Sequence, residues 1–175
     1  MTLDTLHPDF RAKVEQLLAN LARQGFTLRP YCTVRDPFEQ AKLWRQSRSS
    51  QQIKTMVARL RAQGAGRIAA CIEEVGPRSG KPVTNAVPGY SWHQYGEAID
   101  CFLLDKDGHA DWDSSALGYV VYAREATALG LRAGRDFGDS PHVQFRHHEP
   151  HHDNSPARLD VMLAERYPGF ATLDG

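Results

Sequence analysis

Two short stretches of the sequence hold side chains whose types and spacing suit a metal ion. The first contains His93 and Asp100, seven residues apart, and the second contains Asp139 and His142. Imidazole nitrogens and carboxylate oxygens are ligands of catalytic zinc, which takes three protein ligands and keeps one position open. His93, Asp100 and His142 therefore make a candidate ligand set for one Zn²⁺ ion, and one carboxylate is left over.

The sequence around each candidate ligand explains how the side chains could meet. Gly96, between His93 and Asp100, lets the chain turn. Asp100 lies in an apolar run typical of a buried strand, and a buried carboxylate is costly unless it is paired or binds a metal. An arginine partner would also satisfy Asp100. His142 is expected in a second strand, with Gln144 on the same face.

The remaining polar candidates have roles beside the metal. Asp139 is the candidate general base, because a carboxylate near an activated water can accept its proton and pass it to the leaving amine. Arg35 is a second catalytic candidate, which would stabilise an oxyanion or hold a substrate carboxylate. Ser91 and Gln40 are candidate hydrogen-bonding contacts to substrate. Trp92 and Tyr95 flank His93 and would either line a cleft or pack.

The hydrophobic pattern predicts helices and short strands without a regular βαβ alternation, so we expect the α+β class. The expected architecture is a small antiparallel sheet that carries the metal site and is flanked by helices. Pro30 interrupts the first strand signal and indicates an edge strand or a bulge. The predicted helices cover about 8–24, 37–48, 49–64, 68–75 and 113–129, and the predicted strands cover about 26–34, 98–104 and the region of 143.

Length and composition predict one catalytic domain over residues 1–175, with a core at about 8–146 and a helical tail at 155–170. Apolar residues make up 41% and charged residues 24% of the chain, as in ordinary globular proteins. The net charge of zero argues against a nucleic-acid partner. No apolar run is long enough for membrane insertion. The three cysteines are widely spaced, which argues against a disulfide framework.

The combined motifs resemble the M15 zinc peptidases of bacterial cell walls, which share the Hedgehog/D-Ala-D-Ala-peptidase fold. Ser91, His93, Gly96, Ala98 and Asp100 match that family's first metal motif. The similarity extends to its base and third ligand, at Asp139 and His142, and to its R-x-x-x-E-Q segment, at Arg35, Glu39 and Gln40. It covers roughly residues 10–146. The resemblance implies a zinc-dependent peptidase acting on the peptidoglycan stem peptide.

Two details indicate a branch of the family. The base is Asp139 and the aromatic residue after the last ligand is Phe145, whereas D-Ala-D-Ala carboxypeptidases and dipeptidases tend to have Glu and Trp. The chain is more similar to the L-alanyl-D-glutamate endopeptidases, which include phage endolysins. A D-Ala-D-Ala carboxypeptidase or dipeptidase is the alternative, and a non-enzymatic metal-binding cell-wall module is a further one. Residues 49–76 look like a helical insert, which leaves the shape of the cleft open.

The N-terminus has neither a basic region nor an apolar segment typical of a secretory signal. We therefore expect a protein that is made in the cytoplasm and reaches the cell wall by another route such as a phage holin. We also expect a monomer. One tempting tract, His147–His152, lacks the spacing that fixes metal ligands and contains Pro150. The pattern favours a solvated loop there.

Overall fold

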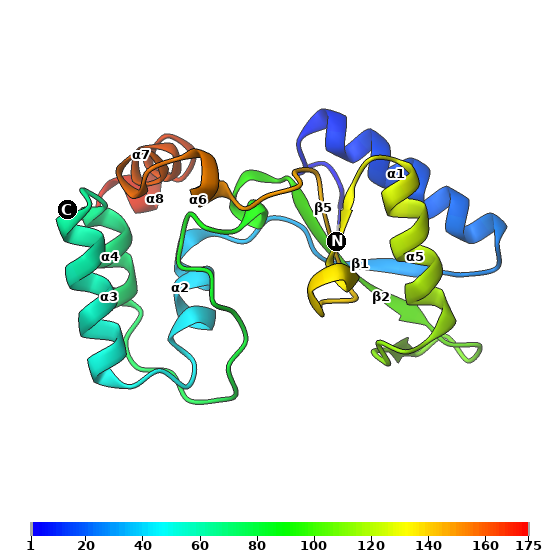
Figure 1. Cartoon of the computed structure of the whole chain (residues 1–175), viewed down its shortest axis with the longest axis horizontal. Helices are drawn as coiled ribbons and strands as arrows, with labels where there is room; N and C mark the ends of the chain where they lie inside the picture. Colours follow the sequence, from blue (N-terminus) through cyan, green and yellow to red (C-terminus); the bar gives the residue numbers. More distant parts are fainter. Residues whose placement is uncertain (1, 175) are drawn as a thin grey trace. The chain divides into compact units, whose positions relative to one another are not determined.

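The computed structural model describes residues 2–174, which form helices and a small antiparallel sheet and so confirm the α+β class. The chain divides into two compact units (Figure 1). Unit 1 comprises Met1–Val34 and Tyr95–His147, and unit 2 comprises Arg35–Gln94 and His148–Gly175. Two compact units do not by themselves decide between one catalytic domain and two, so the single domain stays a prediction.

Unit 1 is built on an antiparallel sheet whose strands follow the order β1-β2-β5-β4, with β3 also paired to β2. The central strand β2 carries Asp100, and β5 carries His142. Together they place both candidate ligands in the middle of the sheet. The strands are Leu28–Cys32 (β1), Ala98–Leu104 (β2), Ala110–Asp111 (β3), Arg132–Ala133 (β4) and His142–Gln144 (β5).

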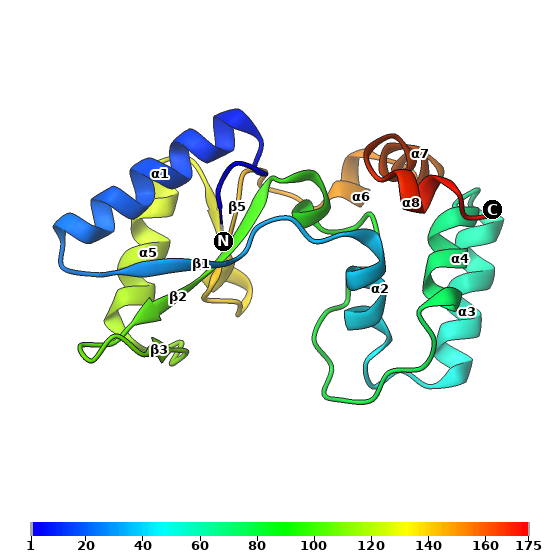
Figure 2. The same cartoon turned by 180° about the vertical axis from the view of Figure 1, so that it is seen from behind.

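Alternation along β2 separates the two faces of this sheet. Ile99, Cys101 and Leu103 belong to the apolar core of unit 1, so Asp100 and Phe102 lie on the opposite face. Helices Pro8–Arg23 (α1) and Leu117–Ala128 (α5) pack on the core face (Figure 2). The sheet thus has one face that stabilises the fold and another that is available for chemistry.

The expected irregularity at Pro30 is confirmed. Strand β1 is at the edge of the sheet, and its register with β2 shifts between Pro30 and Cys32. Proline has no N–H to donate to a ladder, which restricts it to such positions. The shift brings Cys32 opposite Asp100.

Unit 2 is helical. Its helices are Pro37–Arg45 (α2), Ser50–Ala62 (α3), Gly66–Glu74 (α4), Pro150–Asp153 (α6), Pro156–Arg166 (α7) and Pro168–Ala171 (α8). Helix α2 is capped by Asp36, which accepts from the backbone N–H of Glu39, and helix α7 is capped by Ser155, which accepts from that of Arg158. The turn Trp92–Tyr95 (η1), a short 3₁₀ helix, carries His93.

Two local expectations were wrong. Helix α5 begins after Ala116 rather than at about residue 113, because the Asp113 carboxylate instead accepts hydrogen bonds from the N–H and hydroxyl of Ser115. Pro150 begins helix α6 rather than interrupting a loop, since proline suits the first helical turn. Among the helices of residues 2–174, none has the length and apolar character needed to cross a bilayer.

Candidate metal centre

Asp100 and His142 stand opposite each other on the antiparallel strands β2 and β5. The Nδ1 atom of His142 is 2.9 Å from a carboxylate oxygen of Asp100. The neighbouring pair in the same ladder, Ile99 and Val143, lies in the core. Burial of that apolar pair fixes the register, and the register brings the two polar side chains together on the other face.

Asp139 joins this pair from the loop before β5. Ligand atoms of Asp100, Asp139 and His142 all lie within 4.8 Å of one another. The loop is held by its own backbone: the Asp139 N–H donates to the Gly134 carbonyl at 2.9 Å, and the His142 N–H donates to the Asp139 carbonyl at 3.0 Å. Unit 1 alone therefore assembles two carboxylates and an imidazole.

Gly134 makes that loop possible, and the sequence pattern did not single it out. A Cβ atom at position 134 would lie 2.2 Å from the Asp139 carbonyl oxygen and 2.6 Å from the His142 Cβ. Neither neighbour is a flexible side-chain end, so a larger residue would push the loop away. Only glycine permits this close approach of the 3₁₀ turn Gly134–Phe137 (η2) to β5.

Gln144 orients the imidazole. Its Nε2 donates to the Arg146 carbonyl at 2.8 Å, so its Oε1 faces the Nε2 atom of His142 at 3.0 Å. An amide oxygen only accepts, so His142 carries a proton on Nε2. In the neutral ring the Nδ1 lone pair then faces the Asp100 carboxylate.

This arrangement fits a metal ion. A lone pair and a carboxylate oxygen at 2.9 Å repel unless a cation lies between them, either a metal ion or a second proton on His142. Asp139 adds a second negative charge to the same cluster. Two ligand atoms at tetrahedral zinc would be about 3.4 Å apart, so a shift of roughly half an ångström would accommodate the ion.

An ion pair holds the two ligand-bearing strands together near this pair. The Arg146 guanidinium donates to both carboxylate oxygens of Glu97, from Nε at 2.6 Å and from Nη2 at 3.1 Å. Glu97 precedes β2, Arg146 follows β5, and the Phe145 N–H donates to the Glu97 carbonyl. Paired donors fix geometry as well as adding energy, so this contact keeps Asp100 aligned with His142.

Cys32 places a further possible metal-ligand atom beside Asp100. It is the cross-strand partner of Asp100 on β1, and its sulfur lies within 4.8 Å of a carboxylate oxygen of Asp100. The thiol is half-buried, whereas Cys71 and Cys101 are buried. The wide spacing of the cysteines in the sequence gave no reason to place one of them beside a candidate ligand.

Unit 2 gathers a second set of the expected residues. The Gln40 Oε1 accepts from Arg35 Nη1 and from Gln94 Nε2, both at 3.0 Å, while its own Nε2 donates to the Ala86 carbonyl at 2.7 Å. The Arg35 N–H donates to the His93 carbonyl at 3.3 Å. Gln40 is fully buried, so it positions Arg35 and the His93 turn; its direct contact with substrate stays a prediction.

Gln94 is a further positioning residue that the pattern did not reveal. Its Oε1 accepts from the Gly89 N–H at 2.9 Å and from the Ser91 N–H at 3.4 Å. The Tyr167 hydroxyl donates to its carbonyl oxygen at 2.6 Å. The turn that carries His93 is thus held by the buried side-chain amide of Gln94 and, at the backbone of the same residue, by the Tyr167 hydroxyl.

The other expected substrate contacts are placed as follows. The Trp92 indole is buried and donates to the His148 carbonyl at 2.5 Å, which is a packing contact. Ser91 lies just before η1, and Tyr95 ends it at the start of the second segment of unit 1. Substrate contact by Ser91, Trp92 or Tyr95 stays a prediction.

The histidine tract does not form a preformed metal site. His151 stacks on Tyr90 with ring centroids 4.5 Å apart, and His148 pairs with Asp153 at 3.1 Å. In the described part of the chain, the groups of three metal-ligating side chains with donor atoms within 4.8 Å include no residue of His147–His152. Residues 148–152 of the tract therefore pack and pair within unit 2, whereas His147 belongs to unit 1, where its Nε2 atom lies 3.2 Å from the Gly130 carbonyl oxygen.

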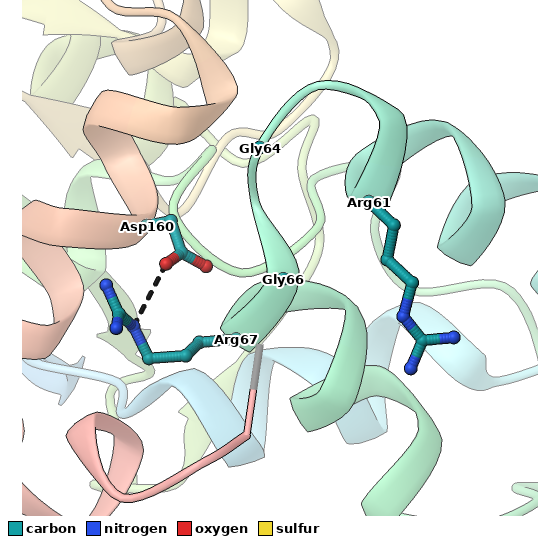
Figure 3. Close-up of a pocket in the computed structure, with 5 residues that line it drawn as sticks. All are labelled: Arg61, Gly64, Gly66, Arg67 and Asp160. Atoms are coloured by element: carbon teal, nitrogen blue, oxygen red, sulfur yellow. Dashed lines mark ion pairs between the residues drawn. The ribbon is translucent and has the colours of Figure 1, made fainter.

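A pocket of about 400 Å³ in unit 2 has a structural explanation (Figure 3). Asp160 accepts a hydrogen bond from the Ile68 N–H at 2.8 Å and pairs with Arg67 at 3.0 Å. It caps helix α4, whose own N-cap residue Ala65 has no side chain to do so. Burial raises the pKa of Asp160, against the opposing effect of these contacts. Arg61 points away from the pair and binds Glu73.

A sheet that presents an aspartate and a histidine, with a further carboxylate from the adjoining loop, defines a candidate centre of the metallopeptidase type. A family model described as "VanY: D-alanyl-D-alanine carboxypeptidase" matches residues 4–118, more than half of the chain. The chain therefore belongs to the VanY family, which confirms its membership of the M15 peptidases. The match includes Arg35, His93 and Asp100 and ends before Asp139 and His142.

A curated relative gives a second comparison. The chain is 36% identical over 78 residues to the peptidoglycan L-alanyl-D-glutamate endopeptidase CwlK of Bacillus subtilis (strain 168). The alignment covers 39% of this chain and 47% of the relative, so the chain spans about half the length of the protein it matches.

Proposed function

We propose that the protein is a zinc-dependent peptidoglycan peptidase that hydrolyses the L-Ala–D-Glu bond of the stem peptide. The observation that carries the proposal is the cluster of Asp100, Asp139 and His142, two carboxylates and an oriented imidazole within 4.8 Å. Membership of the VanY family supports a peptidase acting on peptidoglycan, and the relative CwlK supports the bond. The proposed partner is therefore the stem peptide, met at the cell wall by a monomer; the holin-type route remains part of the proposal.

In this proposal His93, Asp100 and His142 would hold the ion. Zinc, when bound, supplies a Lewis acid that activates water near neutral pH. Asp139 accepts the proton of the attacking water and delivers it to the leaving amine. Arg35, oriented by Gln40, donates hydrogen bonds to a substrate carboxylate or to the oxygen that gains charge in the transition state.

The same fold supports a second candidate, a D-Ala-D-Ala carboxypeptidase or dipeptidase. The description of the matching family favours it, whereas the relative CwlK and the residue types at Asp139 and Phe145 favour the endopeptidase. A non-enzymatic metal-binding module has less support, because such a module has no use for a spare carboxylate at Asp139.

Mass spectrometry of digested muropeptides separates these candidates. Zinc-loaded protein should split stem peptides between L-Ala and D-Glu, and a chelator should abolish the reaction. Loss of terminal D-Ala with an intact stem would establish the alternative. Normal zinc content without cleavage of any wall substrate would favour the non-enzymatic module. Activity that survives complete metal removal would exclude the proposed mechanism.

A further inference from the structure

Three aromatic side chains form a cluster at the surface of unit 1, here called the aromatic platform: the exposed Tyr31 and Trp112 and the half-buried Phe102. The rings of Tyr31 and Trp112 meet edge to face with centroids 5.2 Å apart, and those of Phe102 and Trp112 are 5.6 Å apart. Tyr31 is 57% and Trp112 50% exposed. Large rings left this open to water, and in contact with one another, mark a binding surface more often than isolated exposed residues do.

The platform lies on the same face of the sheet as the candidate metal ligands. Phe102 follows Asp100 by two residues on β2, which puts both side chains on one face about 7 Å apart along the strand. Arg29, directly opposite Phe102 on β1, adds a hydrogen-bond donor at the same place. A molecule that is bound at Asp100 and His142 and runs along the sheet toward Phe102 would therefore reach the platform.

The size of the platform limits what can occupy it. Three rings offer at most a few hundred Å² of contact, well below the roughly 800 Å² that each partner buries in a stable protein–protein complex. A small ligand with an apolar face suits it better. The ring of a hexose has such a face, lined by C–H groups, with hydroxyl and amide groups at its edge for a donor such as Arg29.

We propose that the aromatic platform binds the N-acetylmuramyl sugar to which the stem peptide is attached. This inference rests on the proposed function. L-Ala is joined directly to the lactyl group of that sugar, so the sugar lies one residue from the L-Ala–D-Glu bond. The D-Ala–D-Ala bond is four residues away, about 14 Å in an extended chain. The short separation of Phe102 from Asp100 matches the first distance, so the platform selects the bond nearest the sugar.

Binding of N-acetylmuramyl-L-alanine tests the inference directly, because this probe contains the sugar but no L-Ala–D-Glu bond. Zinc-loaded full-length protein should bind it saturably, and N-acetyl-L-alanine should bind far more weakly. Trp112→Ala should weaken binding about tenfold, and Tyr31→Ala should weaken it in the same direction. Leu117→Ala, at an exposed apolar position of the same unit, is the matched control and should change nothing. Circular dichroism should show that each variant is folded.

Cleavage of peptides with and without the sugar is the second test of the inference. The wild type should cut an N-acetylmuramyl peptide with a lower KM than the same peptide without the sugar, and Trp112→Ala should remove the difference while leaving kcat on the free peptide unchanged. Equal KM values for both substrates, or unchanged probe binding by Trp112→Ala and Tyr31→Ala, would overturn the inference and leave the proposed function intact. A dimer that dissociates in Trp112→Ala would assign the platform to self-association instead. Probe binding through Trp112 without cleavage of any wall peptide would support the inference and refute the proposed function.

Discussion

The Nδ1 atom of His142 faces the Asp100 carboxylate at 2.9 Å because the two residues are directly paired across β2 and β5. If they are metal ligands, Asp100→Asn and His142→Ala should each lose bound zinc, measured by plasma mass spectrometry after dialysis. Asp139→Asn should retain the metal and lose turnover by a factor of about 10² to 10⁴, the usual contribution of a general base. Loss of zinc from Asp139→Asn would make Asp139 a ligand instead.

Gln144 sets the protonated nitrogen of His142, so its replacement should act on the metal without removing a ligand. We expect Gln144→Leu to weaken zinc affinity by about 10- to 100-fold, the usual effect of removing a residue that orients a ligand. Gln144→Glu, which keeps an acceptor for the His142 Nε2 proton, should weaken affinity less. A competition titration with a zinc indicator measures both, and equal affinity in Gln144→Leu and wild type would contradict the assigned tautomer.

Gly134 leaves no room for a side chain. Gly134→Ala should lower the free energy of unfolding by about 1–3 kcal/mol, because the added Cβ meets backbone atoms that cannot rotate away. The displaced loop should also lower zinc affinity. Gly169→Ala is the matched control, since a Cβ there has no atom within 4 Å. Denaturant titration with and without zinc checks both effects, and equal stabilities of the two variants would show that the loop adapts.

Gln40 satisfies three polar groups inside unit 2, so an apolar substitute should leave them unpaired. Gln40→Leu should cost about 1–3 kcal/mol of stability and should lower kcat/KM through Arg35. Gln40→Glu retains the acceptor for Arg35 and Gln94 and should retain more activity. Gln51→Leu, on the exposed face of α3, should have little effect. Wild-type stability of Gln40→Leu in denaturant would rule out the positioning role.

Cys32 provides a chemical probe of the metal centre. Of the three cysteines, Cys71 and Cys101 are buried, and burial raises the pKa of the Cys71 thiol to about 12. Iodoacetamide near neutral pH should therefore label Cys32 alone in the native protein. Zinc should slow the labelling because the sulfur lies within 4.8 Å of Asp100. Mass spectrometry of the labelled peptides follows the reaction, and an unchanged rate with zinc would place the metal away from Asp100.

Much of the fold could be predicted from local sequence because its signals are local. Pro30 indicated both the edge position and the bulge of β1, and the apolar run around Asp100 indicated a central strand. Helix α5 was misplaced at its start because two competing uses of Asp113, as a cap or in a turn, look alike in sequence. Strand β4 has only two residues, too few to produce an alternating pattern.

Some residues of the candidate site could also be predicted from the sequence, and others could not. Asp100, Asp139 and His142 were predicted from residue type and spacing, and the structure brings them together. Gly134, Gln94 and the tautomer-setting role of Gln144 were not, because each depends on an approach between segments distant in sequence or on a side-chain orientation. His93 belongs to unit 2 and its role as a ligand stays a prediction.

The register between β2 and β5 determines both the packing of the core and the position of the candidate metal ligands. Ile99 meets Val143 in the core, and the next pair along the ladder is Asp100 with His142. A slip of β5 by one residue would turn His142 toward the core and Val143 away from it, and so would separate His142 from Asp100. During divergence, such a chain can exchange its polar residues one at a time and keep its fold. It cannot move them along the strand, so inactive relatives should differ at these positions by substitution rather than by insertion or deletion.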